Sequence, residues 1–162
     1  PRPPPTPASP ASRLLRALPA AALAAAVYEN HVHGFDPKAF VANANLAKVF
    51  RPPVALDVDK AGATYVAAVE GAAGLPLYGV QFHPEKPMGE WDPRLAIPHD
   101  ADAVLLSQAL GNFFVGEARR STRTPVTAGF TEDELVMANL RAVFVGKGGY
   151  RGTHFDEIYL LE

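Results

Sequence analysis

Residues 77–85 read LYGVQFHPE, and this stretch governs how the rest of the chain is interpreted. Its first six residues form a short apolar run with β-branched and aromatic side chains, which predicts a buried strand. The run ends abruptly at His83-Pro84-Glu85. Ligands of open α/β sheets bind beyond the carboxyl ends of the strands, so His83 is expected at the edge where chemistry takes place.

His83 and Glu85 have the side-chain types of a general base and its orienting group. A histidine can accept a proton from a nucleophile and return it to a leaving amine. A carboxylate normally fixes the tautomer of such a histidine and stabilises the imidazolium that forms. Glu85 is two residues away, and Pro84 restricts the backbone between them. Spacing alone also fits an ordinary pair of surface side chains.

The remaining segments alternate between strand and helix patterns. Strands are expected at 53–58 and 64–70. Two further apolar segments lie at 142–145 and 156–161. Helices are expected from about Pro19, from Asp36-Pro37 through Ala42, from Ala101 to Arg120 behind the cap Asp100, and over 131–139 behind Thr131. The long helix should bury one face, formed by Leu106, Leu110, Phe113 and Phe114. Residues 84–99 are expected to form a surface loop, and the alternation predicts an α/β protein with a substantially parallel sheet.

Two N-terminal segments differ in composition from the rest of the chain. Residues 1–11 are rich in proline and are expected to form a disordered arm ahead of a domain spanning 12–162. Residues 13–27 place two arginines before an apolar run, as a signal peptide does. A helix starting near Pro19 is the favoured interpretation, because proline suits a first helical turn and alanine has the best helix propensity.

Composition excludes several classes of protein. The 162 residues carry a formal charge of −2, and 48% are hydrophobic, which is typical of a soluble globular protein and not of a dedicated nucleic-acid binder. No apolar run reaches the roughly 18 residues that span a bilayer. The chain has no cysteine, so it cannot itself supply a disulfide, a thiolate metal site or a thiol nucleophile.

The residues from Tyr78 to Lys86 closely resemble the G-V-Q-[FW]-H-P-E signature of the class I glutamine amidotransferase-like superfamily. The flanking segments are similar to those of one branch, the gamma-glutamyl hydrolases or folylpolyglutamate hydrolases. Those segments are Glu90-Trp91, Ile97-Pro98-His99, Asn112 to Arg119 and Phe155 to Leu160. The resemblance covers about residues 12–162, and Gly89 departs from it where the family usually carries an aromatic residue.

The resemblance implies a three-layer, flavodoxin-like α/β fold, of which this chain would be the C-terminal part. It implies hydrolysis of the γ-glutamyl bonds of folylpoly-γ-glutamates through a thioester, in which a cysteine attacks, His83 transfers the proton and Glu85 orients His83. The superfamily's cysteine lies upstream of these segments, and no serine here sits in a G-x-S-x-G context. This chain alone is therefore expected to be inactive. By the same resemblance, His31 would bind the substrate and help to stabilise the oxyanion.

Two other functions remain open at this point: a different class I amidotransferase-type hydrolase, and a cysteine-free pseudoenzyme that binds a γ-glutamyl ligand. His31-x-His33 together with His83-x-Glu85 could imitate a zinc site, but no metal and no cofactor is expected. His99 and His154 are interpreted as loop and surface residues, and Glu90 and Trp91 as anchors of their loop. The resemblance implies a vacuolar, lysosomal or extracellular location and allows a homodimer. Neither nucleic acid nor a membrane is an expected partner.

Overall fold

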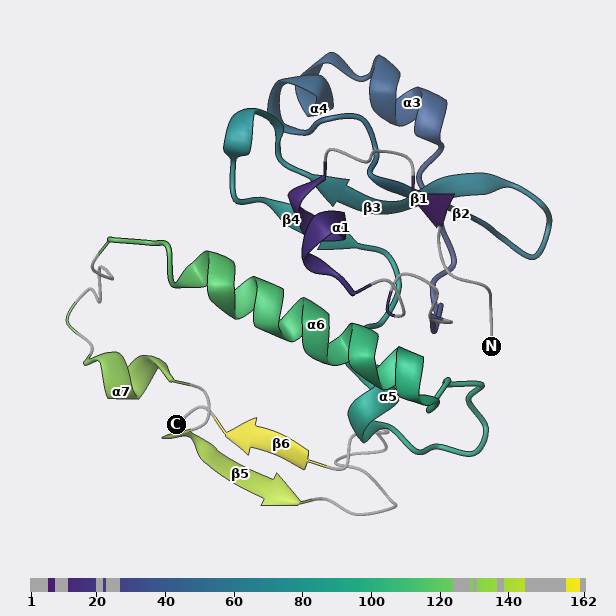
Figure 1. The fold of residues 1–162 in the computed structure, drawn as a ribbon. Helices are drawn as coiled ribbons and strands as arrows, with labels where there is room; N and C mark the ends of the chain where they lie inside the picture. Colours follow the sequence, from purple (N-terminus) through teal and green to yellow (C-terminus); the bar gives the residue numbers. More distant parts are fainter. Residues whose placement is uncertain are drawn as a thin grey trace. The chain divides into compact units, whose positions relative to one another are not determined.

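The computed structural model describes residues 6–7, 12–19, 22, 27–123, 129, 131–136, 139–144 and 157–160. It contains both helices and strands, as the sequence predicts (Figure 1). The chain divides into two compact units, Pro1–Ser121 and Thr122–Glu162, and each is described by itself. All the candidate site residues that the structure describes belong to the first unit.

The first unit is built on a four-stranded sheet in the order β1-β2-β3-β4. The strands are β1 (Thr6–Pro7), β2 (Ala55–Val58), β3 (Thr64–Glu70) and β4 (Tyr78–Val80). Strands are thus present within the predicted ranges 53–58, 64–70 and 77–82. Of the proline-rich arm the structure describes β1 alone, which pairs with β2.

Every neighbouring pair in this sheet is antiparallel, so the prediction of a substantially parallel sheet is wrong for the described strands. The reason lies in the connections. Between β2 and β3 the chain makes a tight turn, in which Asp59 Oδ1 accepts hydrogen bonds from the N–H groups of Ala61 and Ala63 at 2.8 Å each. A parallel pair needs a crossover of a dozen or more residues, and this turn is far too short for one.

β4 is half-buried along its length, whereas the sequence predicted a buried strand. It lies at the end of the strand order and pairs only with β3 among the described residues. β3, in contrast, has partners on both edges, and its residues 65–68 are buried. The difference in burial therefore follows from position in the sheet.

Among the helices that the structure describes with their bounds, four α-helices and a 3-10 turn precede the long helix. They are α1 (Arg13–Ala17), α3 (Pro37–Ala42), α4 (Ala44–Val49), η1 (Ala72–Gly74) and α5 (Lys86–Gly89). α3 has the predicted bounds because Asp36 accepts a hydrogen bond from the N–H of Ala39 at 2.7 Å, as an N-cap does. α5 interrupts the stretch 84–99 that was predicted to be loop. Most of the helix predicted from Pro19 lies outside the described residues.

The long helix α6 (Ala101–Ala118) begins behind Asp100, as predicted, and ends two residues before the predicted Arg120. Its buried residues are Ala103, Leu106 and Ser107, with Leu110 and Phe113 packed partly against the core. Phe114 is 71% exposed, so its assignment to the buried face is wrong. Adjacent helical positions point about 100° apart, and the ring of Phe113 is the one that packs edge-on against Tyr78, with ring centroids 4.8 Å apart.

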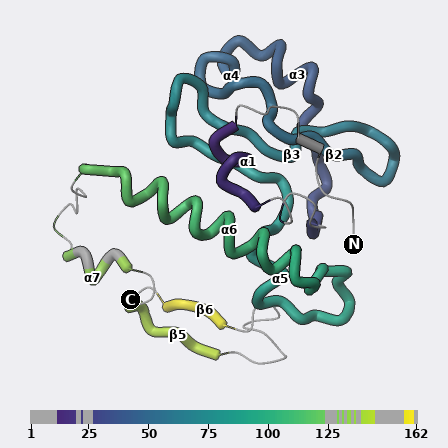
Figure 2. Tube along the Cα trace, viewed as in Figure 1, coloured from purple at the N-terminus to yellow at the C-terminus, as the bar shows by residue number. Residues whose placement is uncertain are grey.

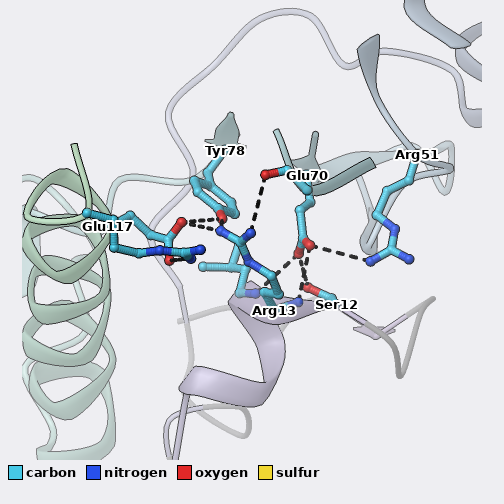
Figure 3. Close-up of polar contacts among 9 residues, drawn as sticks. Ser12, Arg13, Arg51, Glu70, Tyr78 and Glu117 are labelled. Atoms are coloured by element: carbon cyan, nitrogen blue, oxygen red, sulfur yellow. Dashed lines mark hydrogen bonds and ion pairs between the residues drawn. The ribbon is translucent and has the colours of Figure 1, made fainter. Parts of the chain in front are cut away.

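A buried carboxylate ties α1 to the sheet (Figure 3). Glu70, at the end of β3, accepts a hydrogen bond from Ser12 Oγ at 2.6 Å and from the N–H groups of Arg13 and Leu14 at 3.2 Å each. The Arg51 guanidinium lies 3.4 Å from the same carboxylate. Burial raises the pKa of Glu70, but these hydrogen bonds and the Arg51 charge outweigh it and hold the pKa below its ordinary value.

Arg13 extends this network to β4 and α6. Its guanidinium donates to the hydroxyl of Tyr78 and to the carboxylate of Glu117, and Tyr78 also donates to Glu117 at 2.8 Å (Figure 3). One arginine thereby connects α1, β4 and α6. These polar contacts lie beside the buried cluster of Leu14, Val54, Ala55, Tyr65, Ala67 and Ala68.

The second unit contains a short helix and a hairpin-like strand pair, traced in Figure 2. α7 (Glu132–Leu135) begins with a capping box between Thr131 and Glu134, and it is shorter than the predicted 131–139. β5 (Arg141–Phe144) and β6 (Glu157–Leu160) pair antiparallel and lie at the apolar segments 142–145 and 156–161. His154 lies outside the described residues. No helix in the described ranges has the length and apolar character to cross a membrane.

Candidate functional site

His83 is placed by the backbone that follows β4. Gln81 donates its N–H to the carbonyl of Ala67 at 2.9 Å, and Phe82 is buried beside Val27 and Leu106. His83 then donates its N–H to the carbonyl of Tyr28 at 2.9 Å. An anchored phenylalanine and a long-range backbone bond thus fix the position from which the His83 side chain extends.

The imidazole of His83 and the carboxylate of Glu85 are in contact. His83 Nδ1 lies 2.8 Å from Glu85 Oε1, and the two side chains are 36% and 63% exposed. The carboxylate can only accept when ionised, so Nδ1 carries the hydrogen. His83 Nε2 makes no hydrogen bond within the part of the chain that the structure describes. A ring held through Nδ1 with Nε2 free is the arrangement of a general base.

The electrostatics of Glu85 agree with this arrangement. Burial raises its pKa, but hydrogen bonds from its own backbone N–H and from His83, with the charges of His83 and Lys86, outweigh burial and leave the pKa below its ordinary value. Glu85 is therefore ionised at neutral pH and available to orient His83. The nucleophile that such a pair would activate is not a cysteine of this chain, because the chain has none.

His31 lies three residues after Tyr28, whose carbonyl accepts the His83 N–H, but its side chain faces another cluster. Its Nδ1 bonds the carbonyl of His33 at 3.0 Å, and its Nε2 lies 2.8 Å from Glu29 Oε2. That second distance is an ion-pair distance without hydrogen-bond alignment: Nε2 and both Glu29 oxygens are buried without a hydrogen-bond partner. The Tyr28 ring, three residues earlier, lies 5.9 Å from the His83 ring, centroid to centroid.

Tyr65 of β3 completes the surroundings of His31. The two rings meet edge-on with centroids 5.0 Å apart, and the Tyr65 hydroxyl donates to Asp57 Oδ2 at 2.9 Å. Burial raises the pKa of Tyr65 above its ordinary value, and the carboxylates of Asp57 and Glu29 raise it further. The structure therefore brings His31 together with Glu29 and Tyr65, and it shows no contact between the side chains of His31 and His83.

An apolar cavity of about 390 Å³ lies beside the His83–Glu85 pair. Glu85 and Ser107 contribute to its wall, and the other lining residues include Leu14, Tyr78, Val80, Met88, Leu110 and Phe113. Its walls come from α1, β4, α5 and α6, all within the first unit. Glu85, the partner of the candidate base, thus borders a space of the size that ligand pockets have.

Glu90, Trp91 and His99 were also singled out from the sequence, and all three lie in the loop that follows α5. His99 bonds the carbonyl of Pro87 through Nδ1 at 2.9 Å and stacks on Trp91, with ring centroids 3.8 Å apart. Glu90 accepts from the N–H of Asp92 at 3.0 Å, so Glu90 and Trp91 hold their own loop in shape. Across the described ranges, no group of three or more His, Asp or Glu side chains is arranged to hold a metal ion.

Comparison with curated proteins gives consistent relatives. The chain is 35% identical over 136 residues to a gamma-glutamyl hydrolase of Glycine max. The aligned residues cover 84% of this chain and 38% of the relative. It is 36% identical over 138 residues to gamma-glutamyl hydrolase 2 of Arabidopsis thaliana (83% and 37%). It is 30% identical over 132 residues to gamma-glutamyl hydrolase B of Dictyostelium discoideum (82% and 36%). This chain belongs to the gamma-glutamyl hydrolase family.

No family model matches the chain. The chain spans less than two fifths of the length of the gamma-glutamyl hydrolases it matches.

The sequence indicated the His83–Glu85 contact but neither the groups around His31 nor the role of Ser107. Asp57 and Tyr65 are cross-strand partners in the β2–β3 register, which the sequence signals only once the turn between these strands is fixed. Glu29 adjoins the predicted His31 segment but has no motif of its own. Ser107 was detectable as a serine on the apolar face of α6, between Leu106 and Leu110.

Proposed function

We propose that this chain is the C-terminal part of an enzyme that hydrolyses the γ-glutamyl bonds of folylpoly-γ-glutamates through a Cys-His-Glu thioester mechanism. One observation supports this most directly: His83 Nδ1 lies 2.8 Å from Glu85 Oε1 at the end of β4, with Nε2 free among the described residues. The names of the relatives, gamma-glutamyl hydrolases, support the γ-glutamyl bond as the bond that is cleaved.

In the proposed reaction the cysteine comes from polypeptide outside this chain. His83 Nε2 takes the thiol proton while the thiolate attacks the carbonyl carbon of the γ-glutamyl amide. The imidazolium gives that proton to the leaving amine, and a thioester remains. Water then attacks the thioester with His83 as base, which releases the carboxylic acid and restores the thiol. Glu85 keeps Nδ1–H oriented throughout, and His31 contacts the substrate and the developing oxyanion.

For the oxyanion role of His31, the ring has to present a nitrogen to the substrate. Its Nε2 is covered beside Glu29, so this part of the proposal requires the ring to turn when substrate binds. The fold that goes with this proposal is three-layered and flavodoxin-like, and its central sheet continues beyond this chain. In support, β4 has a partner on only one edge among the described residues, and it borders the apolar cavity.

The first test is the intact mass of the natural protein with and without a cysteine-alkylating reagent. We expect a mass well above 17.3 kDa and at least one added alkyl group. The alkylated protein should no longer release glutamate from pteroylpolyglutamate. A mass of 17.3 kDa with no addition would contradict the hydrolase and support a pseudoenzyme, since this chain contains no cysteine.

The second test uses variants of the natural protein. His83→Asn should reduce release of glutamate from pteroylpolyglutamate by about 10²–10⁴-fold, the usual loss when a general base is removed. His33→Asn is the matched control, because the His33 side chain is exposed and only its carbonyl contacts His31. Glutaminase activity without pteroylpolyglutamate hydrolysis would instead indicate another amidotransferase-type hydrolase.

On the same family basis we propose a vacuolar, lysosomal or extracellular location and, as an assembly the family allows, a homodimer. Subcellular fractionation tests the location, and recovery in the cytosolic fraction alone would contradict it. Light scattering on the natural protein tests the dimer, and a monomer mass would contradict it.

A further inference from the structure

A buried hydroxyl lies beneath the turn that carries His83 and Glu85. Ser107 of α6 is 5% exposed, and its Oγ lies 2.5 Å from the carbonyl oxygen of Pro84 and 3.1 Å from that of Ala103. A hydroxyl has one hydrogen to donate, and the shorter contact is with Pro84. The contact with Ala103 is the usual back-bond of a serine inside a helix. The contact with Pro84 spans 23 residues and has no such local explanation.

The turn depends on few other polar contacts. Pro84 has no N–H, so its carbonyl is the only backbone group through which a hydrogen bond can hold it. Before it, the His83 N–H is held by the Tyr28 carbonyl at 2.9 Å. No other hydrogen bond joins Pro84 to α6 in the described part of the chain. Ser107 therefore supplies the polar link at the residue between His83 and Glu85.

The helix that carries Ser107 is itself firmly placed. Asp100 accepts a hydrogen bond from the N–H of Ala103 at 3.0 Å, and Ala103 and Leu106 are 1% and 6% exposed. A side chain fixed on this helix can impose its position on the turn. The side chains of His83 and Glu85 are 36% and 63% exposed, and water competes for contacts between exposed charged groups. Their contact accordingly depends on the backbone between them.

We propose that Ser107 is a positioning residue for the His83–Glu85 pair: by holding the Pro84 carbonyl, it sets the backbone that brings Nδ1 and Oε1 together. The inference deepens the proposed function and rests on it for its catalytic meaning. Ser107 acts through His83 and Glu85, because its hydroxyl donates to the Pro84 carbonyl between them. The contact itself is measurable on this chain without any hydrolysis.

The test is nuclear magnetic resonance on the chain with labelled histidine and glutamate, comparing Ser107→Ala with the wild type. The ring ¹⁵N shifts of wild-type His83, recorded at alkaline pH, should report the hydrogen on Nδ1, facing Glu85. In Ser107→Ala they should move towards a mixture of the two tautomers. The pKa of Glu85, read from its carboxyl ¹³C shift, should rise towards its ordinary value because the His83 hydrogen bond contributes to lowering it.

Two further variants make the comparison specific. Gln108→Ala removes an exposed side chain at the next position of α6 and should leave both signals unchanged. Ser107→Thr keeps the hydroxyl, and its added methyl group has room because Ser107 lines the 390 Å³ cavity. Ser107→Thr should therefore retain the wild-type tautomer and the wild-type Glu85 titration.

A folded Ser107→Ala chain with wild-type His83 and Glu85 signals would overturn the proposal, and so would Ser107→Thr behaving like Ser107→Ala. If Ser107→Ala does not fold, Ser107→Cys under reducing conditions replaces it, since a thiol is a weak donor of similar shape. Its signals should move in the same direction by a smaller amount, and unmoved signals would overturn the proposal. The signals of the variants can change as expected while the natural protein fails to hydrolyse pteroylpolyglutamate. That outcome would contradict the proposed function and leave the role of Ser107 standing.

Discussion

Single side chains in this structure differ sharply in how far they affect stability. The Tyr65 hydroxyl is buried and donates to Asp57 Oδ2, whereas the His83–Glu85 pair is exposed. An exposed pair of charged groups contributes little to the free energy of unfolding. The pair therefore has a geometric role, and the stability of this region depends on groups such as Tyr65.

Replacing Tyr65 by Phe should lower the free energy of unfolding by about 1 kcal/mol, because Asp57 then loses a buried hydrogen bond. The effect should depend on pH. The folded chain holds the Tyr65 proton more tightly than the unfolded chain, so this contribution is complete below the unfolded-state pKa and declines as the pH rises beyond it. Urea unfolding at neutral and alkaline pH measures both effects. Equal alkaline sensitivity in wild type and Tyr65→Phe would contradict this expectation.

At the scale of elements, the five-residue helix α1 is too short to be stable by itself. It is held by Glu70 from β3, which accepts the hydrogen bonds of its first N–H groups, and by Arg13, which reaches β4 and α6 (Figure 3). The sequence did not indicate this, because Ser12 and Glu70 are 58 residues apart.

Glu70→Gln should destabilise the chain by about 2 kcal/mol, because hydrogen bonds to a buried charged group are lost or weakened. The lowered pKa of Glu70 gives the pH dependence: the contribution is present above the unfolded-state pKa and is lost as the pH falls through the lower folded-state pKa. Urea unfolding from neutral to acidic pH, followed by the fluorescence of Trp91, the chain's single tryptophan, measures it. Asp102→Asn, exposed on α6, is the control, and a Glu70→Gln chain with the wild-type acid sensitivity would argue against the role given to Glu70.

The positions of the helices and strands were predicted better than the pairing of the strands. Asp36 and Asp100 predicted the starts of α3 and α6 because an N-cap acts on its own helix within three residues. The antiparallel order of β2, β3 and β4 was missed, because alternating strand and helix patterns were taken to mean crossovers. The turn at Asp59 and the short connection through η1 decide the pairing instead.

At the scale of the whole molecule, the first unit contains its own buried core. Within the described part of the chain, the two clusters of buried residues and the side chains packed against them lie between Leu14 and Phe113. A chain ending at Ser121 should therefore fold and keep the His83–Glu85 contact. Circular dichroism melting and the His83 ring signals test this. Loss of the cooperative transition or of the Nδ1–H tautomer in the shortened chain would contradict it.

In the candidate site, the contact between residues close in sequence was predictable, and the contacts between residues far apart in sequence were not. His83 and Glu85 lie two residues apart, and a nine-residue motif identified them. The cluster of Glu29, His31 and Tyr65 depends on how the segment after Val27 meets β3, and the link from Ser107 to Pro84 depends on where α6 packs. Such contacts follow from tertiary packing, which one sequence does not specify.

The short connections between β2, β3 and β4 also have a consequence for the order of folding. Contacts between residues close in sequence form fastest, because little chain entropy is lost in closing them. We expect the hairpin of β2 and β3 to form first and β4 to add to it. The bond between Tyr28 and His83 closes a much longer loop and should form late. The backbone position of the candidate base would then be completed near the end of folding, after most of its supporting sheet exists.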